Sequence, residues 1–141
     1  SFVWSKLLTE LQQFGIIDEF PPQELIKLFT NGGDPWAITL LAVIAIVLAP
    51  IVEELIFRGG IYRFLKSQST VLLAQIISSA LFATMHSNLM SFLPLVVVGI
   101  ILARVYERSG SILVPMCFHA CFNGFSLLML LIMSQSSLTT N

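Results

Sequence analysis

Four ionisable side chains stand within stretches of the sequence that are otherwise almost entirely apolar: Glu53, Glu54, His86 and His119. A carboxylate can act as a general base and an imidazole can hold a water molecule, while Asn123, four residues after His119, adds an amide donor. Hydrolysis of an amide bond needs a base that activates water and donors that stabilise the oxyanion. Glu53, His86 and His119 could instead bind zinc, because two histidines and a carboxylate form a known catalytic ligand set.

The spacing of charged residues predicts different roles for the two adjacent carboxylates. Arg58 follows Glu54 by four residues, so these two side chains can pair along one face of a helix. Glu53 points roughly 100° away around the helix and has no cation at helical spacing. An unpaired charge inside a membrane costs about 2.5–3.5 kcal/mol on insertion scales. We therefore expect Glu53 to serve a reaction and Glu54 and Arg58 to support it structurally.

The histidines have a structural alternative. His86 ends a stripe of small or polar residues at helical spacing that includes Ser79 and Phe82, and His119 pairs with Asn123 in the same way. Such residues can simply hydrogen-bond across a helix interface. However, three separate apolar stretches supply the ionisable groups, and this favours one shared site.

Composition places the whole chain in a membrane. Its 141 residues are 56% hydrophobic and 11% charged, which is far more apolar than an ordinary globular domain. The net charge of −1 offers no basic surface for nucleic acid. Cys117 and Cys121 lie in an apolar run, which indicates buried small side chains rather than a disulfide or a metal clip. The chain begins with Ser1 rather than methionine, and we expect that an earlier part is missing.

Two parts are expected along the chain. In residues 1–34, Leu7, Leu11 and Phe14 recur at helical spacing, which predicts a short amphipathic, interfacial preface. Residues 35–135 form the expected membrane core. Because a spanning helix takes about 20 residues, its apolar blocks predict four membrane helices, near 36–58, 70–87, 90–107 and 111–133. The expected fold class is all-α, a multi-pass transmembrane helical bundle.

Proline and glycine residues in the first predicted helix, and the depth of the site residues in the membrane, affect how the site can form. Pro50 removes one backbone hydrogen bond and can kink the helix just before the two carboxylates. Gly59–Gly60 is an ordinary signal for a helix end. At 1.5 Å per residue, Glu53 and His119 lie roughly 8–12 Å from one membrane side and His86 nearer 24 Å. These side chains can meet only if the second helix starts later, tilts or stops within the membrane.

Basic residues predict the orientation. Arg58, Arg63 and Lys66 crowd the first connection between helices, and Arg104 and Arg108 crowd the third. Because basic residues concentrate in cytoplasmic loops, both connections are expected on the cytoplasmic side, with the site near it.

Three short motifs resemble one known family. The stretch "EELIFRG" resembles the EExxxR motif, "FATMH" the FxxxH motif and "HACFN" the HxxxN motif of the intramembrane CAAX proteases and bacteriocin-processing enzymes, which include the type II CAAX prenyl endopeptidase. The segment "GIILARVYERSGSILVP" before the last motif is also similar, and the likeness covers about residues 36–130. All three motifs follow the family's order and fall on predicted membrane helices.

The resemblance implies an all-helical, multi-pass endopeptidase of peptide or protein substrates at the membrane, of which prenylated CAAX proteins are the best known. It implies that Glu53 with His86 activates water and that His119 with Asn123 forms the oxyanion site. It also implies a glutamate-dependent reaction without a metal cofactor, with zinc as the alternative.

Two other classes of protein fit the composition. One is a non-catalytic membrane immunity or assembly factor with the same fold, and the other is a proton-coupled transporter subunit that uses Glu53 and the histidines as a relay. Transport predicts inverted repeats or paired broken helices, and the sequence has neither. The presence of all four candidate catalytic residues favours the protease over an inert scaffold.

Overall fold

The structure is a computed structural model that describes residue 6, residues 34–86 and residues 89–138. Every element in this described part is a helix, and no strand occurs there. The predicted fold class, an all-α transmembrane bundle, is therefore confirmed. The predicted interfacial preface lies outside the described residues, apart from Lys6 and Asp34.

One helix of 34 residues runs from Pro35 to Gln68. Asp34 caps its start, because the Asp34 carboxylate accepts a hydrogen bond from the backbone N–H of Trp36 at 3.2 Å. Pro35 takes a first-turn position, where its missing N–H costs nothing. Five segments make up this helix: α3 (Pro35–Val43), η1 (Ile44–Leu48), α4 (Ala49–Glu54), η2 (Leu55–Tyr62) and α5 (Arg63–Gln68). The two η segments are π-helical, and α4, which carries both adjacent carboxylates, lies between them.

The predicted helix end at Gly59–Gly60 is wrong, because both glycines lie inside η2 and the chain stays helical to Gln68. Packing explains the difference. Tyr62 is fully buried and forms a core cluster with Ala74 and Ala103 from the following helices. Burial of this ring outweighs the cost of glycine in a helix, which is about 1 kcal/mol per residue.

The remaining helices are α6 (Val71–Thr84), α7 (Leu89–Ser109) and α8 (Leu113–Leu138). Three stretches of the described part are long and apolar enough to cross a membrane: Pro35–Gln68, Leu89–Ser109 and Leu113–Ile132. The four helices of the predicted bundle are therefore present in the described part, but α6 has only 14 residues and is shorter than a spanning helix. We expected His86 to reach Glu53 and His119 only if the second helix starts later, tilts or stops within the membrane. The short α6 corresponds to the last of these arrangements.

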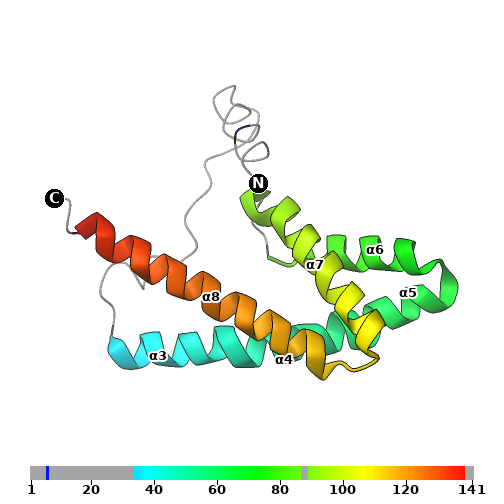
Figure 1. The fold of residues 1–141 in the computed structure, drawn as a ribbon, viewed down its shortest axis with the longest axis horizontal. Coiled ribbons are helices and arrows are strands. Elements are labelled where there is room, and N and C mark those ends of the chain that lie inside the picture. The colour runs from blue at the N-terminus through cyan, green and yellow to red at the C-terminus, as the bar shows by residue number, and fades with distance from the viewer. Residues whose placement is uncertain (1–5, 7–33, 87–88, 139–141) are drawn as a thin grey trace.

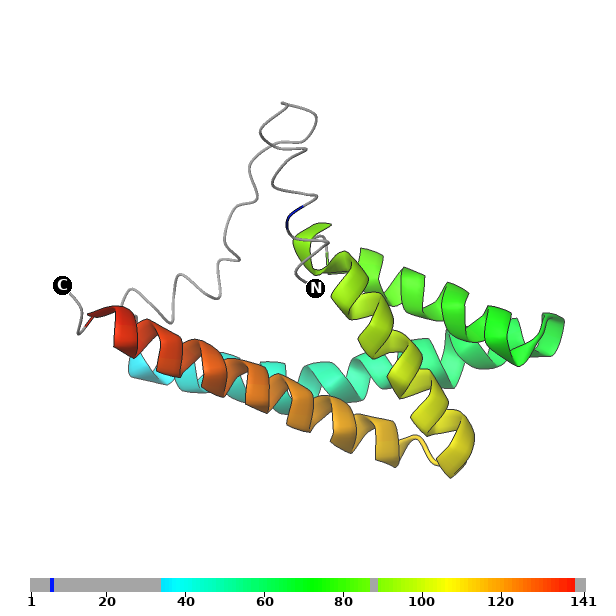
Figure 2. The ribbon, with the colours of Figure 1, turned by 45° about the horizontal axis from the view of Figure 1, so that its top comes forward.

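The helices pack so that α4 lies near the centre. Figure 1 shows the long helix, labelled α3 to α5, with α8 lying along part of it, and α8 packs against η1 and α4. Figure 2 shows from another side that α6 turns back over α5 and η2, while α7 crosses between α6 and α8. The carboxylates of α4 therefore face residues from several helices.

Hydrogen bonds join the end of the long helix Pro35–Gln68 to the end of α7. The Tyr62 hydroxyl donates to Glu107 at 2.7 Å, and the Lys66 ammonium donates to the other oxygen of the same carboxylate. The first and third connections therefore lie at the same end of the bundle, as the basic residues predicted. That this end faces the cytoplasm stays a prediction.

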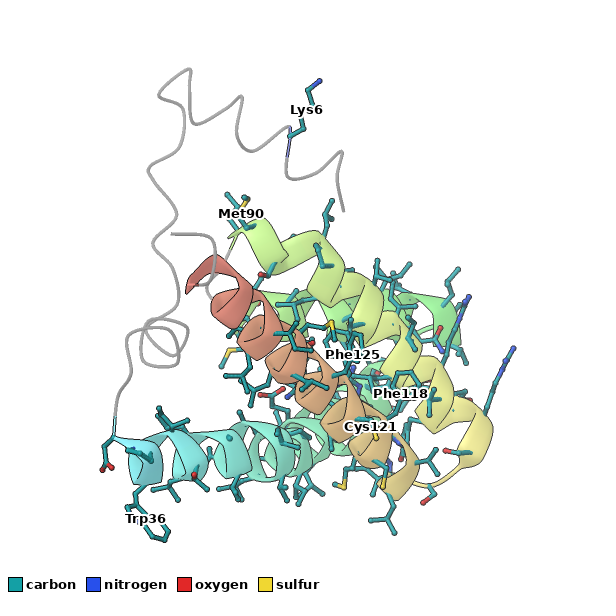
Figure 3. All side chains as sticks on the ribbon, turned by 60° about the vertical axis from the view of Figure 1, so that its left-hand side comes forward. Lys6, Trp36, Met90, Phe118, Cys121 and Phe125 are labelled. Atoms are coloured by element: carbon teal, nitrogen blue, oxygen red, sulfur yellow. The ribbon has the colours of Figure 1, made fainter. Side chains whose placement is uncertain are left out.

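The prediction that Cys117 and Cys121 are buried is wrong, because both thiols are exposed. The reason is the rotation of α8, which turns His119 inward and so turns the residues two positions away outward. Figure 3 shows Cys121 on this outward face with Phe118 and Phe125, which are also exposed. An apolar outward face of this kind is what a lipid-facing helix presents.

Candidate active site

Three parts of the bundle bring the predicted site residues together. α4 carries Glu53 and Glu54, α8 carries His119, and His86 follows the end of α6. The π-helical segments on either side of α4 were not predicted from the sequence. Single π-helical turns occur frequently at functional sites because they change the rotation of a helix locally.

A buried series of charged groups links η2, α4 and α8. The Arg58 guanidinium donates to Glu54 Oε1 at 2.8 Å, and His119 Nδ1 donates to the same oxygen at 2.9 Å. The three side chains are 1%, 0% and 3% exposed, respectively. The predicted pair of Glu54 with Arg58 is therefore confirmed. The contact between Glu54 and His119 was missed, because it joins residues 65 positions apart and no local spacing encodes it.

These hydrogen bonds define the tautomer of His119. A guanidinium stays protonated in proteins, so Glu54 balances it as a carboxylate that can only accept. His119 Nδ1 must therefore carry the proton, and its Nε2 lies 3.7 Å from Oε2 of Glu53. The Glu53 side chain is 27% exposed, and its Oε2 is buried without a hydrogen-bond partner among the described residues. The expectation that Glu53 lacks a cationic neighbour holds along its own helix only, since the imidazole comes from α8.

His86 has its ring oriented in the same way. His86 Nδ1 lies 3.0 Å from the carbonyl oxygen of Phe82. A carbonyl only accepts, so Nδ1 donates and the neutral ring carries its lone pair on Nε2. In both histidines, Nδ1 thus donates a hydrogen bond to a protein oxygen, and Nε2 is left for other partners.

The ring of Phe82 lies at the centre of the site, a role beyond its place in the FxxxH motif. Its ring centroid lies 4.8 Å from that of His86, 5.7 Å from that of His119 and 5.3 Å from that of Phe57. The Arg58 guanidinium lies 5.0 Å from the same centroid, within cation–π range. The signal was present in the sequence, because Phe82 precedes His86 by one helical turn.

A cavity of about 400 Å³ contains both Glu53 and His86. It lies between the long helix and the end of α6, and its wall is mostly apolar. The other lining residues are Ile56, Phe57, Ile61, Leu81, Thr84 and Met85. The structure therefore brings the predicted base and one predicted imidazole to the same cavity.

Asn123 has a structural contact that the sequence did not predict. Its Nδ2 donates to the carbonyl oxygen of Ala45 in η1 at 2.9 Å. In η1 the N–H of Ala49 bonds to the carbonyl of Ile44, five residues back. The next bond of this π pattern would join Ala45 to residue 50, which is proline and has no N–H. Asn123 therefore supplies the donor that Pro50 lacks and still has a second amide N–H.

The predicted zinc ligands are not gathered as a ligand set. Among residues 34–86 and 89–138, no three or more His, Cys, Asp or Glu side chains are grouped so that they could hold a metal ion. Nδ1 of His119 bonds to Glu54 and Nδ1 of His86 to a backbone carbonyl, and metal-binding histidines also use their second nitrogen in this way, so these bonds do not exclude zinc at Nε2. The choice between a metal-free and a zinc-dependent reaction at Glu53, His86 and His119 therefore stays a prediction.

Comparison with known proteins agrees with the motifs. A family model described as type II CAAX prenyl endopeptidase Rce1-like matches residues 35–125, which include every candidate site residue. A Bacillus subtilis (strain 168) protein named "Putative membrane peptidase YdiL" is 33% identical over 93 residues, which is 66% of this chain and 38% of that protein. An uncharacterized 24.3 kDa protein of Escherichia coli is 36% identical over 100 residues, or 67% of this chain and 46% of that protein.

The chain spans less than half the length of these two relatives. No solved structure matches it. Because the family model covers well over half of the chain, the resemblance seen in the three motifs is confirmed, and the chain belongs to the Rce1-like family of type II CAAX prenyl endopeptidases.

Proposed function

We propose that this protein is an intramembrane endopeptidase that hydrolyses peptide bonds of membrane-associated substrates. The observation that carries the proposal is the cavity shared by Glu53 and His86, with the imidazole of His119 beside Glu53. Membership of the Rce1-like family and the name of the Bacillus subtilis relative support a membrane peptidase. Three helices of spanning length in the described part of the chain support an integral membrane protein.

In the proposed reaction, a water molecule in the cavity donates hydrogen bonds to Glu53 and to Nε2 of His86. Glu53 removes a proton from this water as the oxygen attacks the peptide carbonyl carbon, and the carbonyl oxygen becomes an oxyanion. Glu53 then passes the proton to the amide nitrogen, the C–N bond breaks, and the two peptide products leave. Each cycle consumes one water molecule and returns Glu53 to its carboxylate form.

His119 and Asn123 are the proposed donors to the oxyanion. Because Nδ1 of His119 already donates to Glu54, its Nε2 can donate only when the ring is an imidazolium. The charges of Arg58 and the imidazolium then cancel those of Glu53 and Glu54. A site without net charge avoids the high cost of an unbalanced charge in an apolar environment. Asn123 contributes the amide N–H that Ala45 does not use.

The proposal is tested by comparing the termini of membrane proteins in cells that contain the wild-type protein or Glu53→Gln. The amide keeps the shape of the side chain but cannot act as a base. We expect new termini that appear only with the wild-type protein. Identical sets of termini would contradict the proposal, and so would a Glu53→Gln protein that restores every wild-type phenotype, which would point to a non-catalytic assembly or immunity factor.

Peptides based on the termini found in this way define the substrate class. Family membership suggests prenylated CAAX peptides, so each peptide should be assayed with and without its lipid. Faster cleavage of the prenylated form is expected. Equal rates would remove the lipid from recognition while leaving the peptidase proposal intact.

A further inference from the structure

α6 and α7 lie close together at Gly99, a buried glycine near the middle of α7. A Cβ atom added at Gly99 would lie 2.8 Å from Cβ of Ser79 and 3.0 Å from its Cα and Oγ. Ser79 is fully buried, and its hydroxyl donates to the carbonyl of Gln75 at 2.6 Å. Since part of the obstruction is the backbone of α6, rotation of the Ser79 side chain cannot remove it. Only glycine fits where the two helices meet.

The same residue anchors the charged groups of the site. The carbonyl oxygen of Gly99 accepts a hydrogen bond from the Arg58 guanidinium at 2.9 Å. A second nitrogen of Arg58 donates to Glu54, and Glu54 holds Nδ1 of His119. The backbone of α7 is thereby connected through two buried side chains to the imidazole on α8. The series begins at the Gly99 carbonyl, so the position of this oxygen depends on how closely α7 lies against α6.

We propose that Gly99 is a positioning residue for His119. Its lack of a side chain lets α7 lie against Ser79, and this places the Gly99 carbonyl where Arg58 can bridge it to Glu54. The inference rests on the proposed function for the role of His119, but the geometry it concerns can be measured without a substrate.

The first test is kinetic. Gly99→Ala should lower kcat on the order of 10- to 100-fold, because misplacement of a catalytic group by about 1 Å has effects of this size. KM should change little, because Gly99 does not line the cavity with Glu53 and His86. The matched control is Gly124→Ala in α8, where an added Cβ meets only Ile46 at 3.8 Å. Wild-type kcat in folded Gly99→Ala would overturn the proposal.

The second test is rescue. Ser79→Gly removes the side-chain carbon and oxygen that an alanine at position 99 would meet, so that only backbone of α6 remains in its way. The double variant should therefore recover part of the lost kcat. A double variant that is no faster than Gly99→Ala would show that the loss does not arise from crowding against the Ser79 side chain, and would overturn the proposal.

The third test needs no activity. The chain has two histidines, so ¹⁵N-histidine NMR of the protein in nanodiscs gives two sets of ring signals, assigned with His86→Ala. Gly99→Ala should shift the Nδ1 signal of His119 and leave that of His86 in place. If Gly99→Ala does not insert, Arg58→Lys replaces it, because an ammonium keeps the charge but lacks the two nitrogens that bridge Gly99 and Glu54. An unchanged His119 signal overturns the proposal, whereas a wild-type protein that cuts nothing counts against the proposed function alone.

Discussion

Glu53 and Glu54 are neighbours in sequence but have different surroundings in the structure. Glu53 lines a cavity, whereas Glu54 is fully buried and holds Arg58 and His119. We predict that Glu53→Gln retains the melting temperature of the wild-type protein and lowers kcat by at least about 100-fold, the smaller end of the usual contribution of a general base. Thermal unfolding in detergent and turnover of a cleavable peptide measure the two effects. A Glu53→Gln enzyme with near-normal kcat would remove Glu53 from the reaction.

Glu54 should affect both stability and turnover. Glu54→Gln leaves the Arg58 guanidinium buried without its counter-charge, a defect typically worth about 3–5 kcal/mol. Arg58→Gln added to this variant should recover part of the stability, because the unpaired charge is then gone. Turnover should stay low in the double variant, because His119 Nδ1 still lacks its carboxylate.

A double-mutant cycle on unfolding free energy, with kcat recorded for each of the four proteins, makes this measurement. Coupling near zero between Glu54 and Arg58 would contradict the structural pair. Recovery of kcat together with stability would contradict the orienting role of Glu54 toward His119.

At the scale of elements, the Asn123 amide has two roles that can be tested separately. One N–H stabilises η1 by donating to the Ala45 carbonyl, and the other is the proposed oxyanion donor. Asn123→Ala leaves the Ala45 carbonyl without its donor and should cost about 1–3 kcal/mol. In a Pro50→Ala background residue 50 has an N–H that can bond to Ala45, so the same substitution should cost less. The loss of kcat should persist in that background, because the proposed oxyanion donor is still absent.

Unfolding free energies and kcat of Asn123→Ala, Pro50→Ala and the double variant test this prediction. If Pro50→Ala restores kcat along with stability, Asn123 is a structural residue only.

The structure also shows which features local sequence patterns can predict. The apolar runs and the paired carboxylate and arginine depend on spacing within one helix, and these were predicted correctly. The continuation of the long helix past Gly59–Gly60 depends on the burial of Tyr62 against two later helices. The hydrogen bond between Glu54 and His119 likewise depends on how α8 packs on α4. Neither feature has a local signal, because each arises only when helices distant in sequence meet.

At the scale of the whole molecule, metal dependence remains a prediction to be tested. We expect the purified protein to keep its activity after exhaustive chelation and to contain much less than one zinc per chain by elemental analysis. The reason is that all four candidate residues have metal-free roles and, within the described ranges, the three predicted zinc ligands are not grouped for metal binding. Loss of activity on chelation that zinc alone restores would assign Glu53, His86 and His119 a ligand role.

The short helix α6 has a consequence for the supply of water. Fourteen residues rise only about 21 Å, less than the roughly 30 Å of hydrocarbon in a bilayer. Backbone that is not helical at membrane depth is tolerated only where protein covers it or where it lines a water-filled space. Met85 and His86, directly after α6, line the cavity that holds Glu53. The proposed hydrolysis consumes a reactant that the surrounding lipid cannot deliver, and we expect it to reach Glu53 at the early end of α6, where the cavity begins.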